Sequence, residues 1–425
     1  MRLAIVLSVL LAGYSCARRP HPNVTVTIMG LSLDSGRQLQ TSLESFAEKT
    51  GIHADLMPAL GSSAEQVTQT LRLLNQHAGT PDVYVIDVVY PGTLSEHLLD
   101  LTPYVDADAH AHLPELLQND TVHGHLVSLP FYVNVGMLYY RTDLLEKYHY
   151  PHPPNTWSEL ESMAAKLQQG EREAGNPAFW GYVWQGRAYE GLTCNALEWQ
   201  VSFGGGRIVE SNGVISVNNR AAIQALEAGS RWRDKISPPS VLSYTESDSL
   251  HIFSAGNAAF LRHWSGGFPP ARARDSAVAG RFSMAALPAG PHGRAQALGG
   301  FHLAVSRYSK HPREAAELVR YLTGSEVQLQ RALSGGYLPS IPSLYRNPEL
   351  LRVLPFVKEL QNPAAPAWIA RPSTVTGDKY KEVSKAYYTA VSDVLNRKTR
   401  PESALARLEK QLVELTGLPT GPPVP

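Results

Sequence analysis

The chain has 425 residues, a formal net charge of zero and a hydrophobic content of 43%. This length is sufficient for two or three domain-sized cores, and a neutral chain is not expected to have nucleic acid or an anionic membrane surface as its main partner. No interior apolar run is long enough to span a bilayer. The composition therefore predicts a soluble globular body.

The N-terminus differs from the rest of the chain. A basic start followed by the apolar stretch Leu3–Gly13 is typical of a secretory signal and too short for a transmembrane helix. Cys16 follows it as in a bacterial lipoprotein signal, although two of the three residues before this cysteine depart from that pattern. Cleavage after Ala17 is the alternative. We expect residues 1–16 to be a signal peptide, Cys16 to be lipidated, and the protein to be exported to the periplasm or cell surface.

Cysteine usage gives no sign of a disulfide framework. The only cysteines are Cys16 and Cys194. If Cys16 is lipidated or removed, no internal disulfide can form, and a core of this size does not require one. We predict that Cys194 is a small buried apolar residue rather than a nucleophile.

The first part of the chain alternates strands with helices. The β-branched stretch Val24–Ile28 predicts a strand and Gly30–Gly36 a loop, and Asp82–Asp87 predicts a strand that ends in an acid. Between them the same criteria predict a strand over 52–58 and helices over 39–49 and 64–76. This alternation implies a parallel α/β sheet. Ligands of such sheets lie beyond the carboxyl ends of the strands, where Asp87 falls.

The later part of the chain is mostly helical, with a few extended segments. Residues 129–140 form one extended segment that is continuous enough to cross between two domains. Thr156 is a plausible N-cap for the helix that follows it. A helix and a short strand are expected within 246–264, and a strand returns at 298–306.

Residues 179–206 concentrate aromatic rings, an amide and a carboxylate between glycines. An aromatic ring beside an acid or amide suits a sugar, because the ring covers a C–H face while the polar groups take the hydroxyls. The alternative is a buried strand–turn–helix whose aromatic side chains belong to the core.

Enzyme and metal signatures are weak. The chain has no GxSxG elbow, P-loop or HExxH motif, and no cofactor is expected. A glycoside hydrolase would need two carboxylates, such as Asp87 and Glu246, to meet across the fold. A zinc-binding importer subunit would need the paired histidines to converge, although solvent-exposed histidines explain them equally. These histidines are His110, His112, His123 and His125.

The chain resembles the family 1 extracellular solute-binding proteins of ABC importers, in their maltose/trehalose-type branch. Six stretches in the family's order carry this resemblance and span nearly the whole mature chain. They are Asp82–Gly92, Leu129–Leu145, Trp184–Gly191, Gly256–Trp264, Leu298–Phe301 and Ala370–Pro372.

The resemblance implies a two-lobed α/β fold of the type II periplasmic-binding-protein class, with parallel-type sheets flanked by helices and a hinge of crossover strands. The expected lobes are residues 24–129 with 298–342, and 130–293 with 345–425. A sugar would be enclosed between them by hinge closure and delivered to ABC permease transmembrane subunits, without catalysis. We expect a monomer. A sensor-coupled receptor would use the same fold and differ only in its partner.

The resemblance also implies a set of ligand-binding residues. Three positions depart from the family pattern. Gln66 lies near the position where the family commonly has an arginine, Gly266 lies where it has an aromatic residue, and Phe301 lies where it often has a tryptophan. A smaller or differently polar pocket is expected, so the predicted disaccharide, a trehalose/maltose-like glycan, is not fixed by the resemblance. The implied site residues are Asp87, Trp264, Arg371, Glu246, Asn134, Tyr132, Gly300, Phe301 and, as a weaker match, Asp34.

Overall fold

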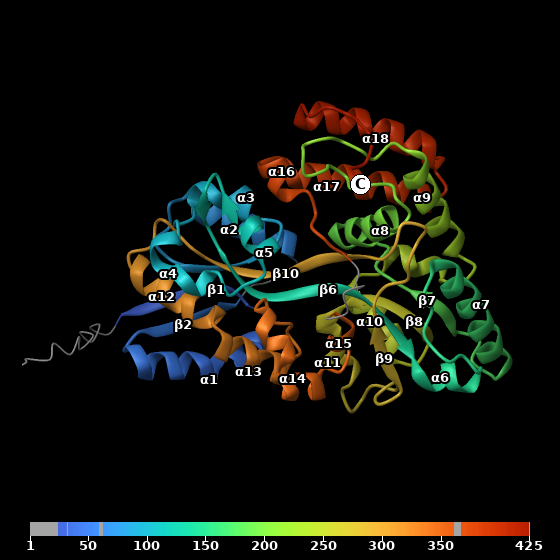
Figure 1. Ribbon diagram of the computed structural model, residues 1–425, viewed down its shortest axis with the longest axis horizontal. Coiled ribbons are helices and arrows are strands. Elements are labelled where there is room, and N and C mark those ends of the chain that lie inside the picture. The colour runs from blue at the N-terminus through green and yellow to red at the C-terminus, as the bar shows by residue number, and fades with distance from the viewer. Residues whose placement is uncertain (1–23, 32, 59–62, 361–366, 425) are drawn as a thin grey trace, which may run out of the picture.

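The computed structural model describes residues 24–31, 33–58, 63–360 and 367–424. The predicted signal peptide and Cys16 lie outside these residues. Figure 1 shows two bodies of helices at the two ends of a long sheet, with strands β6 (Leu129–Arg141) and β10 (Ala295–Val305) running from one into the other. The predicted two-lobed α/β fold and the crossing segment are confirmed. Within the described residues, no helix combines the length and apolar character needed to cross a membrane.

The remaining strands are shorter than these two. They are β1 (Thr25–Leu31), β2 (His53–Pro58), β3 (Val83–Asp87), β4 (Thr121–Val122), β5 (His125–Leu126), β7 (Trp180–Val183), β8 (Ala258–Trp264), β9 (Phe282–Ala285) and β11 (Ala367–Ile369).

Helices cover both ends of the sheet. In the first half of the chain they are α1 (Leu33–Thr50), α2 (Ser63–Asn75), α3 (Pro91–Leu94), α4 (Thr102–Ala109), α5 (Pro114–Asp120), α6 (Thr142–Lys147), α7 (Trp157–Glu173), α8 (Glu190–Ser202) and α9 (Arg220–Trp232). In the second half they are α10 (Glu246–Ser254), α11 (Phe268–Ala271), α12 (Pro312–Thr323), α13 (Ser325–Gly335), α14 (Pro348–Val353), α15 (Val357–Leu360), α16 (Ser373–Thr376), α17 (Tyr380–Leu395) and α18 (Pro401–Thr416), with a short 3-10 helix, η5 (Gly377–Lys379), between α16 and α17.

The main sheet has the order β2-β1-β3-β10-β6-β8-β7, with β11 beside β10 and β9 beside β6. Its first three strands are parallel, as predicted. β10 instead lies antiparallel between β3 and β6. The sheet is therefore mixed, because its middle strand comes from a distant part of the chain and not from the local strand–helix alternation.

The predicted loop over Gly30–Gly36 is wrong. β1 continues through Leu31 and α1 begins at Leu33. Gly30 has φ +116°, and a Cβ there would lie 2.7 Å from the carbonyl oxygen of Val85. This glycine therefore permits close approach of β1 and β3 at a left-handed backbone position, so it does not mark a loop.

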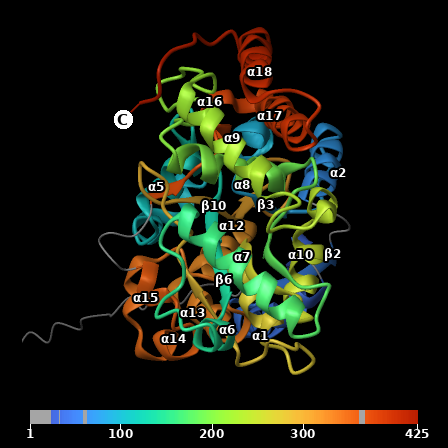
Figure 2. The same cartoon turned by 90° about the vertical axis from the view of Figure 1, so that its right-hand side faces the viewer.

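Two apolar cores each lie within one lobe, and a further apolar cluster contains residues of both lobes. One core joins α7, α8, α9, α17 and α18, which belong to the right-hand lobe of Figure 1 and face the viewer in Figure 2, and contains the fully buried Trp184, Trp199 and Trp232. Another packs α1 and α12 against β1 and β3. The core interpretation is therefore correct for Trp184 and Trp199 of the aromatic 179–206 stretch.

The predicted N-cap of α7 is confirmed and can be tested. Thr156 has extended backbone angles, and its side chain accepts a hydrogen bond from the Glu159 amide at 3.1 Å. Thr156→Ala should lower the free energy of unfolding by about 1 kcal/mol, because it leaves one N-terminal amide without its partner. Urea unfolding followed by circular dichroism measures this change. Thr156→Ser keeps the acceptor and should retain most of the stability; equal losses in both variants would contradict a capping role.

Candidate functional site

Strand register brings four of the predicted site residues together. Asp87, the last residue of β3, lies opposite Phe301 in β10, and Phe301 in turn lies opposite Tyr132 in β6. The rings of Tyr132 and Phe301 are 5.6 Å apart. Asn134, two residues further along β6, faces Gly299 of the next strand. The middle of the sheet therefore presents a carboxylate, two aromatic rings and an amide in one row.

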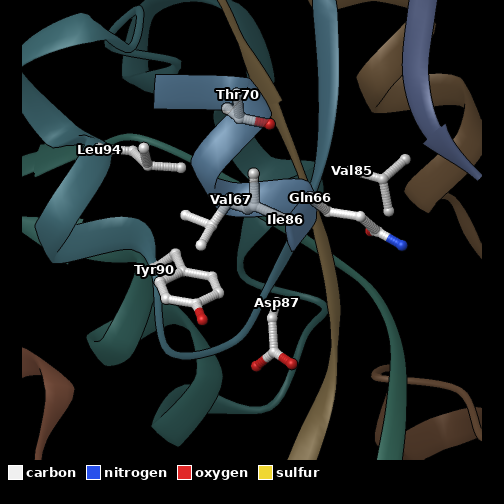
Figure 3. Close-up of a pocket in the computed structure, with 8 residues that line it drawn as sticks. All are labelled: Gln66, Val67, Thr70, Val85, Ile86, Asp87, Tyr90 and Leu94. Atoms are coloured by element: carbon white, nitrogen blue, oxygen red, sulfur yellow. The ribbon is translucent and has the colours of Figure 1, made fainter. Parts of the chain in front are cut away.

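A small pocket lies directly beside Asp87. Figure 3 shows that the carboxylate of Asp87 and the hydroxyl of Tyr90 point in the same direction, whereas the side chain of Gln66 extends sideways, away from both. The pocket holds about 10 Å³ of open space, which is room for one water molecule and not for a sugar ring. Gln66, one of the three departures from the family pattern, does lie at the site. The other lining residues are Val67, Thr70, Val85, Ile86 and Leu94.

Trp264 is fixed by a carboxylate. Its indole Nε1 donates to Oε1 of Glu246 at 3.1 Å, and the hydroxyl of Tyr189 donates to Oε2 of the same carboxylate at 2.5 Å. Asn134 secures the turn after the tryptophan, because its Oδ1 accepts from the Gly266 amide at 3.1 Å. Glu246 and Trp264, which were predicted only as separate site residues, are thus in direct contact, and the half-buried indole is held by its edge.

Arg371 links the two ends of the site. Its Nη1 donates to Oε1 of Glu190 at 2.7 Å, and its Nη2 lies 3.4 Å from Oδ1 of Asp87 and 3.3 Å from the Leu298 carbonyl oxygen. The side chain is 3% exposed. Burial opposes the charge, but the neighbouring groups, Asp87 and Glu190 among them, hold the pKa of the Arg371 guanidinium well above its ordinary value. Arg371 therefore remains a cation between two carboxylates.

Several residues of this network were missed from the sequence. Glu190 also accepts hydrogen bonds from Tyr380 and, at 2.5 Å, from Ser384, both on α17. Tyr189 and Glu190 belong to the 184–191 motif, whose aromatic and acidic character was a usable signal. Tyr380 and Ser384 gave no signal, because α17 reaches Glu190 only through the tertiary fold.

A cluster of aromatic rings and one arginine flanks Tyr132. The Tyr337 ring lies 4.7 Å from Tyr132, and the guanidinium of Arg331 lies over both rings and over Phe131. Burial lowers the pKa of Arg331 to about 10. Arg331 and Tyr337 are further additions to the predicted set.

Two predicted site residues, Gly300 and Asp34, are not seen as side-chain contacts in the site. Gly300 has φ +129°, and a Cβ there would lie 2.3 Å from the Tyr132 carbonyl oxygen, so this glycine allows β10 and β6 to approach. Asp34 falls in the first turn of α1, but its side chain lies outside the described residues.

The segment that carries the paired histidines contains α4, α5, β4 and β5. His112 is buried against Ser340 at 2.8 Å, and the exposed His125 contacts Asp100 at 2.9 Å. His110 and His123 are exposed. In the described part of the chain, no three His, Cys, Asp or Glu side chains are grouped so that they could hold a metal ion.

Cys194 is buried in α8, and burial raises the pKa of its thiol to about 12. It is therefore a packed apolar residue, as predicted, and not an activated nucleophile.

Comparison with known proteins gives the family. The profile of the bacterial extracellular solute-binding proteins matches residues 41–359. A probable ABC transporter-binding protein of Deinococcus radiodurans is 44% identical over 419 residues, which cover 98% of this chain and 99% of that protein.

The chain belongs to the bacterial extracellular solute-binding protein family.

Comparison with solved structures places this chain in the sugar-binding branch of the family. The maltose-bound MalE3 of T. maritima is 33% identical, with a TM-score of 0.84 over 92% of this chain and 100% of that one. A binding protein of Thermotoga lettingae with bound α-D-tagatose has a TM-score of 0.79 at 20% identity over 93% of this chain and 100% of that one, and supports the fold alone. Membership of this family also means an exported or periplasmic protein of an ABC transporter.

The Tyr189–Glu246 contact predicts a pH dependence. Burial and the adjacent Glu246 carboxylate raise the pKa of Tyr189 far above its ordinary value. In the unfolded chain this tyrosine loses its proton at about pH 10, whereas in the folded chain it keeps the proton to higher pH. Its contribution to the free energy of unfolding is therefore fully present below about pH 10. Above that pH the contribution falls by about 1.4 kcal/mol per pH unit for each such tyrosine. Tyr189→Phe should make the alkaline loss shallower by about one proton in urea unfolding. Tyr104→Phe, in α4, is the control; an equal change of slope in both variants would contradict the assignment.

Proposed function

We propose that the protein captures a disaccharide or short oligosaccharide, a trehalose/maltose-like glycan in the first instance, and delivers it to the transmembrane subunits of an ABC importer. The observation that carries this proposal is the half-buried Trp264 ring, fixed by Glu246 beside the row of Asp87, Tyr132 and Phe301. An aromatic ring covers the apolar face of a pyranose, and the carboxylates and the guanidinium of Arg371 suit its hydroxyls.

Polar groups in the site support selectivity. Asp87 and Glu190 already pair with Arg371, and Glu246 already accepts from Trp264 and Tyr189. A sugar must therefore supply hydrogen bonds at least as good as those that it displaces. An epimer that leaves one of these groups unpaired is disfavoured, because an unsatisfied buried polar group is costly.

Ligand entry requires movement, in this proposal. The pocket at Asp87 has room for one water, and α3 contacts η5 through the Thr93 hydroxyl and the Gly377 carbonyl at 3.3 Å. We propose that residues 24–129 with 298–342 form one lobe, that residues 130–293 with 345–425 form the other, and that the lobes separate about β6 and β10 to admit the sugar.

The protein acts, in this proposal, as a monomer that catalyses nothing. It is held at the membrane by lipid on Cys16 and meets the permease subunits there. A glycoside hydrolase needs one carboxyl group kept protonated as an acid and another positioned against the sugar. Asp87 faces a permanent cation, and both oxygens of Glu246 accept hydrogen bonds, so neither is arranged as the acid.

Thermal unfolding of the mature chain against a sugar panel tests this function, with zinc and chelator alongside and chromatography for products. A sugar at about 100 times its dissociation constant should stabilise the folded state by about 2.7 kcal/mol. A raised midpoint with one disaccharide and no product supports the proposal. A shift with zinc alone would favour the metal importer, product release would favour a hydrolase, and no shift with any sugar would refute the ligand class.

Trp264→Ala gives the sharpest test of the site. Loss of the stacking surface should raise the dissociation constant for the sugar about 10- to 100-fold, since stacking on an aromatic side chain is worth about 1–3 kcal/mol. Isothermal titration calorimetry measures it. Trp180→Ala is the matched control, because Trp180 is also half-buried with an arginine over its ring but lies at the far end of the β7–β8 pairing. Unchanged affinity in the Trp264 variant would exclude this ring from the site.

A further inference from the structure

We propose that a buried ion pair, Arg262 with Glu198, positions the Trp264 ring, so that sugar affinity depends on two residues that do not themselves touch the sugar. This inference rests on the proposed function, because it assigns support for the stacking surface of that same site.

The guanidinium of Arg262 lies under the indole. Arg262 and Trp264 are two residues apart in β8, so their side chains leave the same face of the sheet. The guanidinium carbon is 4.3 Å from the centroid of the Trp264 ring. Because the cation occupies one face of the ring, a stacked ligand would have to use the opposite face.

The guanidinium itself cannot move. Its Nε and Nη2 donate to the two carboxylate oxygens of Glu198, at 2.9 and 2.5 Å, and its Nη1 donates to Oε1 of Gln185 at 3.1 Å. Both members of the ion pair have 0% exposed side chains. Gln185 is held in turn by Ser249 at 2.8 Å. Every donor nitrogen of Arg262 therefore has a fixed partner.

The ion pair is also bound to the strands that carry the site. Oε1 of Glu198 accepts from the Ala297 amide of β10 at 3.0 Å. A Cβ at Gly136, the residue of β6 opposite Trp264, would lie 2.0 Å from Oε1 of Glu198 and 2.7 Å from Nη2 of Arg262. A Cβ at Gly299 would lie 3.0 Å from the Trp264 ring. The two glycines leave the space that the ion pair and the indole occupy, and the pair connects β6, β8 and β10 beneath the ring.

A double substitution separates positioning from folding. Removing one partner alone strands a buried charge, whereas replacing both partners by apolar residues of similar volume is often neutral for stability. Arg262→Met with Glu198→Leu should therefore fold, with a thermal midpoint lowered only by the loss of the acceptor for the Ala297 amide. Because methionine is flexible and lacks a planar group, the Trp264 ring should lose its support.

The experiment combines calorimetry with ¹⁹F NMR of protein labelled with 5-fluorotryptophan. Trp264→Phe assigns the resonance of Trp264. In the double variant that resonance should shift and broaden, and the dissociation constant for the sugar that stabilises the parent should rise about tenfold, within the range that an aromatic stack contributes. Arg172→Met, which removes the cation over Trp180, should leave both readouts at Trp264 unchanged.

Each outcome decides the proposal. A folded double variant with an unchanged Trp264 resonance and unchanged affinity overturns it. If the double variant does not fold, Arg262→Lys keeps the charge but loses the planar group; the same NMR shift and weaker binding are then expected, and their absence overturns the proposal. If the parent binds no sugar of the panel, the proposed function fails, and the ¹⁹F resonance alone decides whether the ion pair positions the ring.

Discussion

The antiparallel pairing of β10 between β3 and β6 is the constraint on which the rest of the structure depends. It sets Phe301 opposite Asp87 on one side and opposite Tyr132 on the other. It also brings Ala297 to the buried Glu198 and Leu298 to Arg371. Because β6 and β10 both run into the second lobe (Figure 1), one pair of strands holds the site residues of the two lobes in a common frame.

Each buried arginine of the site is paired within the protein. Arg371 lies between Asp87 and Glu190, and Arg262 is matched by Glu198. Buried ions are stable only when their partners and hydrogen bonds are complete. The neutral net charge of the chain is thus accompanied by a carboxylate partner for each of these two arginines.

Local sequence patterns predicted many of the helices and strands, but they could not predict contacts between residues that are far apart in the sequence. The strand that ends at Asp87 and the helix capped by Thr156 follow from neighbouring residues alone. The resemblance supplied Trp264, Glu246 and Arg371, whose mutual contacts it did not describe. Glu190 was missed because its partners lie about 190 positions away on α17. Gly30 was misread as a loop signal because its conformation serves the packing of two strands, which no local pattern reveals.

The position of β10 late in the sequence affects how the protein folds during synthesis. The sheet of the first lobe lacks its central strand until residues 295–305 have been made. Contacts between residues so far apart in the sequence form slowly, because the entropy of closing a long loop is lost before strand pairing contributes any favourable free energy. A nascent chain that ends before β10 therefore holds β3 and β6 as unpaired edges. Closure of this sheet is thus delayed until most of the chain of this exported protein has been made.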